Sequence, residues 1–186
     1  MVSAGREFGT GRLRRGVDIG VLIRAWANRG CAMRAEYNGG TMTEQARRGL
    51  FFEELQLGME ANYSRVVTES DIHAFAAISG DDNPVHLDES YAAQTPFKTR
   101  IAHGILSASY ISAVIGTKLP GPGCIYVSQT LNFRAPVRIG DEVVSAVRIT
   151  DLLTEKKRAI LACDCSVNGR TVLDGQAVIL VPSRQA

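Results

Sequence analysis

The residues best suited to acid–base chemistry lie in one short segment, 80–88, which reads GDDNPVHLD. Asp81 and His86 are five positions apart, a spacing that points the two side chains in different directions on either a helix or a strand. Asn83-Pro84 favours an irregular turn, in which both side chains can face one point. A carboxylate and an imidazole that share a water molecule there form a general acid–base pair near neutral pH.

Structural interpretations of the same segment stay open at this stage. The spacing does not distinguish Asp81 from Asp82, and in a simple capping loop either carboxylate would accept backbone amides while His86 only packs. Asp88 is expected to cap the helical turn that follows it. A metal site made by Asp81, His86, Asp88 and His103 would have suitable ligand types. Their spacing matches no established metal motif, so we expect no metal.

A second segment, 101–106, reads IAHGIL and places a glycine where a helix is predicted to begin. Gly104 falls in the first turn, where backbone amides lack intrahelical acceptors and the helix dipole is positive. A glycine lets a substrate carbonyl approach such an amide, so Gly104 is a candidate for an oxyanion hole. Alternatively, Gly104 only allows the helix to pack closely on a sheet. His103 is expected to orient or cap this turn without a chemical role.

The elements that must position these segments predict an α+β fold. Residues 101–117 are apolar or small on nearly every side and carry no charge, which predicts a buried helix. Apolar and polar residues then alternate over four runs, 125–133, 143–149, 161–167 and 172–181. Asn168-Gly169 predicts a two-residue hairpin turn between the last two runs. We therefore expect a curved antiparallel sheet around the buried helix.

Upstream of this helix, the sequence predicts two further elements. Tyr63, Val66 and Val67 indicate a first strand. A helix should follow, with its N-cap at Thr68 or Ser70, because apolar residues recur there at helical spacing. Gly80 is expected to end that helix.

Length and composition limit the class of protein. The chain has 186 residues, of which 45% are hydrophobic and 22% charged, with a net charge of +2. These values fit one globular domain and suggest neither nucleic acid nor a membrane as a partner. The four cysteines form no CxxC pair, and Cys163 and Cys165 are expected to act as small apolar fillers on one face of a strand. A reducing, cytoplasmic location fits this use of cysteine.

The N-terminal residues differ from the rest of the chain. Residues 1–50 contain nine Arg, no Lys and four acidic residues, for a net charge of +5. They show no sustained hydrophobic period, so they are not expected to bury enough apolar surface to fold. Three interpretations are open: a start codon assigned too early, with Met42 as the true start, an organelle transit peptide, or a disordered basic arm. We expect residues 51–186 to form the single folded domain.

Together, the motifs resemble the MaoC-like hydratase family. The resemblance rests on SGDDNPVHLD at 79–88, AHGIL at 102–106, LPGPGCIY at 119–126 and FRAPVRIGDEV at 133–143. It covers about 53–182 and is strongest for the (R)-specific enoyl-CoA hydratases of the type that supplies polyhydroxyalkanoate monomers. The resemblance implies a hot-dog fold, a homodimer, and an acyl pocket near the dimer interface.

The resemblance also implies a reaction, the reversible hydration of a trans-2-enoyl-CoA to an (R)-3-hydroxyacyl-CoA. Asp81 and His86 match the family's water-holding pair, and Gly104 matches its hole-forming glycine. Ser112 corresponds to a serine deeper in the helix, and Asn83 and His103 are expected to support the site. The substrate would be an acyl-CoA, with no metal, flavin or nicotinamide cofactor.

Three other functions remain to be weighed against hydration. A hot-dog thioesterase usually carries a carboxylate on its central helix, and residues 102–117 contain no Asp or Glu. A 3-hydroxyacyl-[acyl-carrier-protein] dehydratase would use the same chemistry with a different carrier. A non-catalytic acyl-CoA-binding protein would not need both Asp81 and His86. The acyl chain length would depend on which of Ile105, Leu106, Ile111 and residues 89–100 line the pocket.

Overall fold

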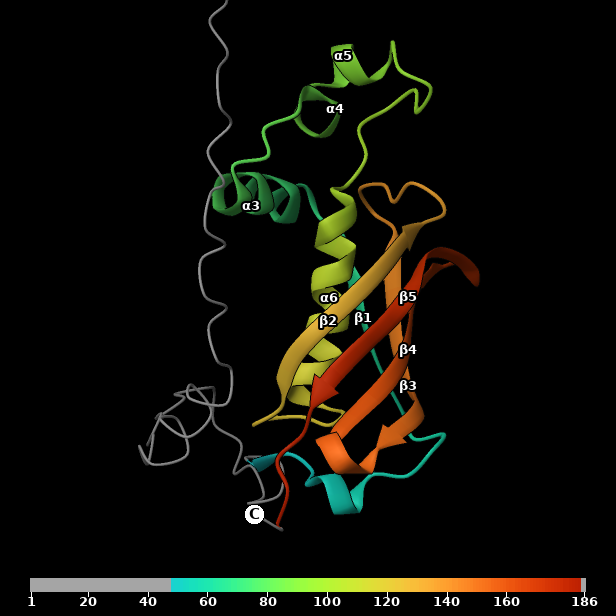
Figure 1. The fold of residues 1–186 in the computed structure, drawn as a ribbon. Coiled ribbons are helices and arrows are strands. Elements are labelled where there is room, and N and C mark those ends of the chain that lie inside the picture. The colour runs from blue at the N-terminus through green and yellow to red at the C-terminus, as the bar shows by residue number, and fades with distance from the viewer. Residues whose placement is uncertain (1–47, 185–186) are drawn as a thin grey trace, which may run out of the picture. The chain divides into compact units, whose positions relative to one another are not determined.

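A five-stranded antiparallel sheet forms the centre of the fold in a computed structural model that describes residues 48–184 (Figure 1). The strand order is β1-β3-β4-β5-β2, which leaves β1 and β2 at the edges. The strands are β1 (Glu60–Val66), β2 (Ile125–Phe133), β3 (Glu142–Leu153), β4 (Arg158–Val167) and β5 (Arg170–Leu180). The helices are η1 (Phe52–Glu54), α3 (Glu69–Ser79), α4 (Pro84–Leu87), α5 (Glu89–Ala92), α6 (Gly104–Thr117) and η2 (Thr154–Lys156). The predictions made for residues 1–47 lie outside the described residues.

The period-2 pattern of the sequence explains the sheet. On β3, Val143, Val147 and Ile149 are buried and their neighbours at 144, 148 and 150 are exposed. Cys163 and Cys165 of β4 are buried in the same core, as predicted, and both are free thiols. Asn168 and Gly169 have φ angles of 50° and 76°, the left-handed values that a tight type I′ hairpin turn requires. The predicted hairpin between β4 and β5 is therefore confirmed.

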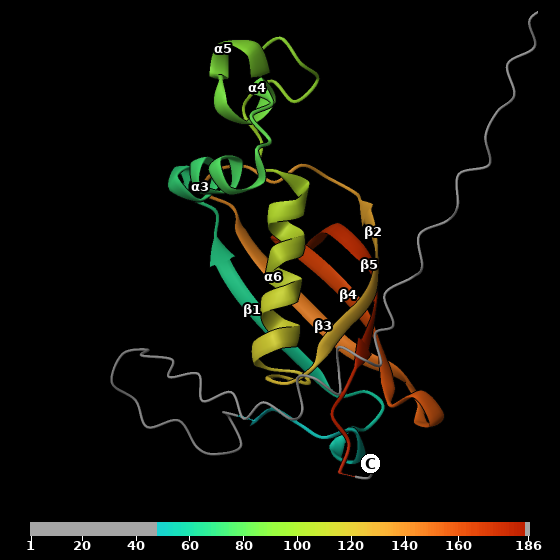
Figure 2. The same cartoon turned by 60° about the vertical axis from the view of Figure 1, so that its left-hand side comes forward.

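The long helix α6 lies across the concave side of the sheet, with β1 on one side of it and β2 on the other (Figure 2). It begins at Gly104 rather than at Ile101. The residues just before Gly104 are not helical, because the Ala102 N–H donates to the carbonyl oxygen of Val137 at 2.7 Å. One side of α6 is not covered by the strands: Ile105 is 52% exposed, and Ser109 and Ser112 are exposed. A single five-stranded sheet covers only one side of a helix, which is why the enclosure that the sequence predicts is incomplete here.

The chain between α3 and α6 lies beyond the N-terminal end of α6 (Figures 1 and 2). Helix α3 begins with a capping box, in which Thr68 accepts the Asp71 amide and the Asp71 side chain accepts the Thr68 amide. Gly80, with φ of 76°, ends α3 in the left-handed conformation that favours glycine. This reversal starts the segment that carries Asp81 and His86. No helix within residues 48–184 is long and apolar enough to cross a membrane.

Candidate active site

Asp81 leaves α3 directly after its glycine cap and begins a tight turn. Its Oδ1 accepts the Asn83 amide at 3.3 Å, and the Asn83 side chain in turn accepts the Val85 amide at 3.2 Å. Asn83 is thus the N-cap of α4, and Pro84 occupies the first helical position, where its missing N–H costs nothing. The two residues predicted to form an irregular turn therefore set the path from Asp81 to His86.

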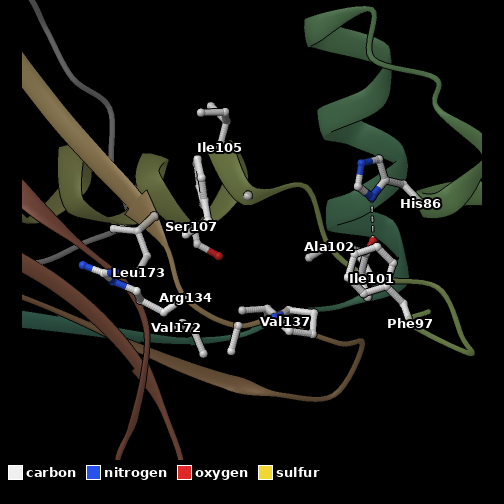
Figure 3. A pocket seen from close by; sticks show the side chains of 14 residues that line it. His86, Phe97, Ile101, Ala102, Ile105, Ser107, Arg134, Val137, Val172 and Leu173 are labelled. Carbon is white, nitrogen blue, oxygen red and sulfur yellow. Dashed lines mark hydrogen bonds between the residues drawn. The ribbon is translucent and has the colours of Figure 1, made fainter. Parts of the chain in front are cut away.

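The protonation pattern of His86 follows from its hydrogen bond. His86 is buried, and its Nδ1 lies 2.8 Å from the carbonyl oxygen of Ile101 (Figure 3). A carbonyl oxygen only accepts, so Nδ1 must carry the hydrogen. In the neutral ring, Nε2 then keeps a lone pair and can accept a proton.

Ion pairs hold the segment that carries the Ile101 carbonyl. The Arg100 guanidinium pairs with Glu69 at 2.9 Å and with Glu89 at 3.4 Å, so one side chain ties α3 to α5. The pKa of each carboxyl group is lowered. For Glu69 the main cause is the hydrogen bond from Arg100, and for Glu89 it is a hydrogen bond from the Thr99 hydroxyl, to which Arg100 adds. Arg100 immediately precedes Ile101, so the same contacts fix the position of the acceptor for His86.

The side chains of Asp81 and His86 converge, although a regular helix or strand would point them in different directions. One ligand atom from each of Asp81, His86 and His103 lies within 4.8 Å of the others. Two hydrogen bonds of ordinary length to one water span roughly 4.5 Å, so this spacing suits a bridging water molecule. Asp82 is not a member of this cluster, and the geometry therefore selects Asp81 over Asp82 as the acid that faces His86.

His103 packs behind this pair. Its Nε2 lies 3.0 Å from the carbonyl oxygen of Asp81, so Nε2 carries the hydrogen and donates it. Its ring contacts the rings of both His86 and Phe75, with centroid distances of 3.8 Å and 4.9 Å. Burial lowers the pKa of His103, and the adjacent His86 lowers it further. His103 precedes α6 but makes no side-chain cap hydrogen bond to it; its side chain instead holds the backbone of Asp81, so it supports the Asp81 turn and not the first turn of α6 that the sequence suggested.

The same three side chains are the ligand types of a metal site, but their arrangement suits water better. The planes of His86 and His103 are tilted by only 32° and the rings are stacked. Lone pairs lie in the planes of imidazole rings, so those of two stacked rings run side by side more than they converge. Asp88, the fourth residue considered from the sequence, instead caps α5 by accepting the Tyr91 amide at 3.1 Å.

Gly104, the candidate backbone donor, has an N–H without a hydrogen-bond acceptor among residues 48–184. It is the first residue of α6. A Cβ at this position would lie 2.6 Å from Cε1 of Phe133, which only a shift of the ring could relieve. The absence of a side chain thus lets the aromatic ring approach the first turn of α6 and leaves the amide uncovered by its own residue.

A cavity of about 470 Å³ joins these parts (Figure 3). It lies between the first turns of α6, the loop before α6, residues 133–137 at and after the end of β2, and the start of β5. Its lining residues are His86, Phe97, Ile101, Ala102, Gly104, Ile105, Ser107, Phe133, Arg134, Ala135, Pro136, Val137, Val172 and Leu173. His86 and Gly104 therefore open on one largely apolar space, of a size usual for small-molecule sites.

Ser112 does not lie where the resemblance suggested. Ser112 is exposed on α6 and does not line the cavity of this single chain. Ser107 does line it, one turn after Gly104, and its side chain is buried. The spacing of three residues from Gly104 would place both on one side of a helix, and this signal was available in the sequence. Asn83 acts on the backbone of α4 and is not among the lining residues.

The fold and this site define a MaoC-like hot-dog protein. The family model described as "MaoC like domain" matches residues 52–162, and the chain belongs to this family. Among curated proteins, it is 54% identical over 138 residues to a 3-hydroxybutyryl-CoA dehydratase of Methylorubrum extorquens, covering 74% of this chain and 88% of the relative. It is 52% identical over 134 residues to an (R)-specific enoyl-CoA hydratase of Rhodospirillum rubrum, covering 72% and 93%.

Solved structures give the same family. R-hydratase PhaJ1 from Pseudomonas aeruginosa, in its unliganded form, superposes with a TM-score of 0.69 at 46% identity, over 73% of this chain and 88% of the other. The (R)-hydratase from A. caviae, described as involved in PHA biosynthesis, superposes with a TM-score of 0.68 at 40% identity, over 70% and 99%. The expected hot-dog fold, an antiparallel sheet around a long helix, is confirmed.

Proposed function

We propose that this protein is a hydro-lyase that catalyses the reversible syn hydration of a trans-2-enoyl-CoA to an (R)-3-hydroxyacyl-CoA. The observation that carries the proposal is the convergence of Asp81 and His86 next to a cavity that Gly104 also lines, with no acceptor for the Gly104 N–H among residues 48–184. The names of the relatives, an (R)-specific enoyl-CoA hydratase and a 3-hydroxybutyryl-CoA dehydratase, describe the two directions of such a reaction.

Asp81 and His86 would hold the attacking water between them. The Asp81 carboxylate accepts one of its hydrogens and the bare Nε2 of His86 accepts the other, since Nδ1 is occupied by Ile101. The water oxygen adds to C3 while Asp81 takes its proton. A proton is then returned from the same pair to C2 on the same face, so the sum of the steps is one water added across the double bond.

Gly104 would stabilise the charge that this addition creates. As the C3–O bond forms, electron density moves onto the thioester oxygen and gives it enolate character. The uncovered Gly104 N–H lies at the positive end of α6 and can donate to that oxygen. One such donor contributes about 3–4 kcal/mol to the lowering of a barrier. Nothing in this scheme requires a metal ion, a flavin or a nicotinamide.

The direct test is the loss of ultraviolet absorbance of the conjugated enoyl thioester when crotonyl-CoA is mixed with the pure protein. We expect the absorbance to fall without release of free CoA, and chiral analysis of the product to give the (R) isomer. Release of free CoA at the same rate would instead identify a thioesterase. Tight binding without any change in absorbance would identify a non-catalytic acyl-CoA-binding protein.

A second candidate is a 3-hydroxyacyl-[acyl-carrier-protein] dehydratase. Mitochondrial proteins of this name from Arabidopsis thaliana and Solanum lycopersicum are 36% and 33% identical to this chain, over 69% of its length in each case. The same residues would act on the same acyl group, and only the carrier would differ. A comparison of kcat/KM for crotonyl-CoA and for crotonyl-acyl-carrier protein decides between the two, and we expect the CoA thioester to be preferred.

The assembly we propose is a homodimer joined through β2. This strand is an edge of the sheet, nine residues long, and its exposed side chains include Ile125, Tyr126 and Val127. A long apolar edge is a template for pairing with another strand, and a second copy offers the same edge across a two-fold axis. Such pairing would also cover the exposed side of α6, on which Ser112 lies.

The cellular setting is proposed on narrower grounds. A cytoplasmic location is supported by the free thiols at Cys124, Cys163 and Cys165, since such cysteines are typical of a reducing compartment. A role in supplying polyester monomers is supported by the one neighbouring structure whose description includes PHA biosynthesis. Expression alongside a polyester synthase, with polymer yield as the readout, would test that role.

A further inference from the structure

Ser107 differs from Ser109 and Thr117, two other hydroxyl-bearing residues of α6. The hydroxyls of Ser109 and Thr117 donate to the carbonyls of Leu106 and Ala113, at 2.6 Å and 2.7 Å, which is the usual arrangement on a helix. Ser107 is only 3% exposed, and its hydroxyl has no hydrogen-bond partner among residues 48–184. In Figure 3 its oxygen points into the cavity.

The surroundings of this hydroxyl are apolar. Of the side chains that line the cavity, only His86, Ser107 and Arg134 are polar. His86 lies at the catalytic end, and Arg134 is largely exposed and paired with Asp174 at 2.5 Å. Ser107 is therefore the one buried hydroxyl between the catalytic end and the apolar wall formed by Val172 and Leu173 (Figure 3).

The position of Ser107 relative to Gly104 indicates which part of a substrate it meets. The two residues are three apart on α6, which is about 4.5 Å along the helix axis. With the thioester oxygen at Gly104 and C3 at the Asp81–His86 pair, a four-carbon acyl group ends one carbon beyond the reacting centre. A longer chain must continue through the rest of the cavity and pass the Ser107 side chain.

We infer that the Ser107 hydroxyl selects against long saturated acyl chains, so that the enzyme prefers short trans-2-enoyl-CoA substrates. The inference rests on the proposed function and specifies its substrate. With a short chain, water reaches the hydroxyl and satisfies it. A longer alkyl chain displaces that water and leaves a buried hydroxyl without a partner, which is unfavourable. The cavity volume of about 470 Å³ does not by itself impose such a limit.

The test compares kcat/KM for crotonyl-CoA, hexenoyl-CoA and octenoyl-CoA in variants of Ser107. Ser107→Ala removes the hydroxyl and creates space, whereas Ser107→Cys replaces it with a poorer hydrogen-bonding group of similar shape. In both variants we expect the ratio of kcat/KM for octenoyl-CoA over crotonyl-CoA to rise about tenfold, equivalent to ~1.4 kcal/mol. Ser109→Ala is the matched control, because that hydroxyl is already bonded within α6, and its ratio should equal that of the unaltered protein.

Each other outcome overturns the inference in a distinct way. A ratio that rises in Ser107→Ala but not in Ser107→Cys would show that space, not polarity, limits chain length. An equal fall in kcat for all three substrates would place the hydroxyl at the thioester instead of the alkyl chain. An unchanged ratio with normal hydration would refute the inference alone. Failure of the unaltered protein to hydrate any of the three would overturn the proposed function and the inference with it.

Discussion

The imidazole rings of His86 and His103 are stacked, with their centroids 3.8 Å apart and their planes tilted by 32°. Each ring donates one N–H to a carbonyl oxygen, His86 to Ile101 and His103 to Asp81. The stack therefore links the proposed base, the proposed proton carrier and the start of α6 through two hydrogen bonds and one ring contact. The contact with His86 adds to burial in lowering the pKa of His103.

This stack predicts a pH dependence of stability. Burial lowers the pKa of His103 in the folded state, whereas the unfolded residue titrates near the ordinary value of about 6.5. Below that pH the unfolded state binds a proton that the folded state does not. The free energy of unfolding should therefore fall as the pH drops below about 6.5, by at most ~1.4 kcal/mol per pH unit from this residue, and level off below the folded pKa.

Urea unfolding of the unaltered protein and of His103→Gln, measured between pH 8 and pH 5, isolates this contribution. Glutamine retains a donor for the Asp81 carbonyl but does not titrate. The difference in unfolding free energy between the two proteins should shrink as the pH falls. Parallel pH curves would mean that His103 titrates alike in the folded and unfolded states.

Asp81→Asn tests the proposed base. The amide oxygen can still accept the Asn83 N–H, which Asp81 accepts at 3.3 Å, so the turn should survive. It cannot take a proton from water, and we expect kcat for crotonyl-CoA hydration to fall by ~10²–10⁴. Asp82→Asn is the matched control, because Asp82 is the adjacent exposed carboxylate outside the cluster. Loss of activity in the Asp82 variant alone would assign the base to Asp82.

Gly104→Ala tests the backbone donor. The new methyl group would lie 2.6 Å from the Phe133 ring, which is a side chain 55% exposed, so we expect the ring to turn aside and the fold to persist. The methyl group and the displaced ring would crowd the amide, and we expect kcat to fall by about 10², as it does when one oxyanion donor is lost. Gly116→Ala, on the same helix with open space around it, is the control for the added methyl group. Normal turnover by Gly104→Ala would remove this amide from the mechanism.

Val127→Lys tests the proposed dimer. A lysine on an edge strand opposes pairing with another strand, so the mass in solution should fall from that of a dimer to that of a monomer. Val144→Lys is a close control, because both valines are 37% exposed but β3 lies between β1 and β4. Light scattering after size-exclusion chromatography gives both masses. A monomeric unaltered protein, or a monomer produced only by Val144→Lys, would contradict pairing through β2.

The parts of the fold that the sequence predicts best are those specified by local pattern. Alternation over 125–133 and 143–149 predicted strands that are observed over Ile125–Phe133 and Glu142–Leu153. Asn168-Gly169 predicted a turn whose backbone angles only a few residue types adopt readily. These features depend on neighbours in the sequence, so no knowledge of distant contacts is needed to find them.

The parts that the sequence leaves open depend on contacts between distant residues. Asp81 and Asp82 cannot be distinguished locally, because the contact that orients the Asp81 backbone comes from His103, 22 residues away. Likewise, α6 starts at Gly104 because the Ala102 amide pairs with Val137, far along the chain. The spacing of Ser107 from Gly104 indicates only that the two share one side of the helix; that this side faces a cavity depends on Val172 and Leu173 of β5.

The division of the proposed reacting groups between two kinds of structure has an evolutionary consequence. Asp81 and His86 belong to the stretch of chain that projects past the end of α6, whereas Gly104 opens the helix that the sheet packs against (Figure 2). Asp81 is exposed, so its substitution can abolish the proposed chemistry without disturbing the apolar interior. Descendants of such a protein could lose the acid and the imidazole, keep a shaped acyl pocket, and be redeployed as carriers or sensors of thioesters.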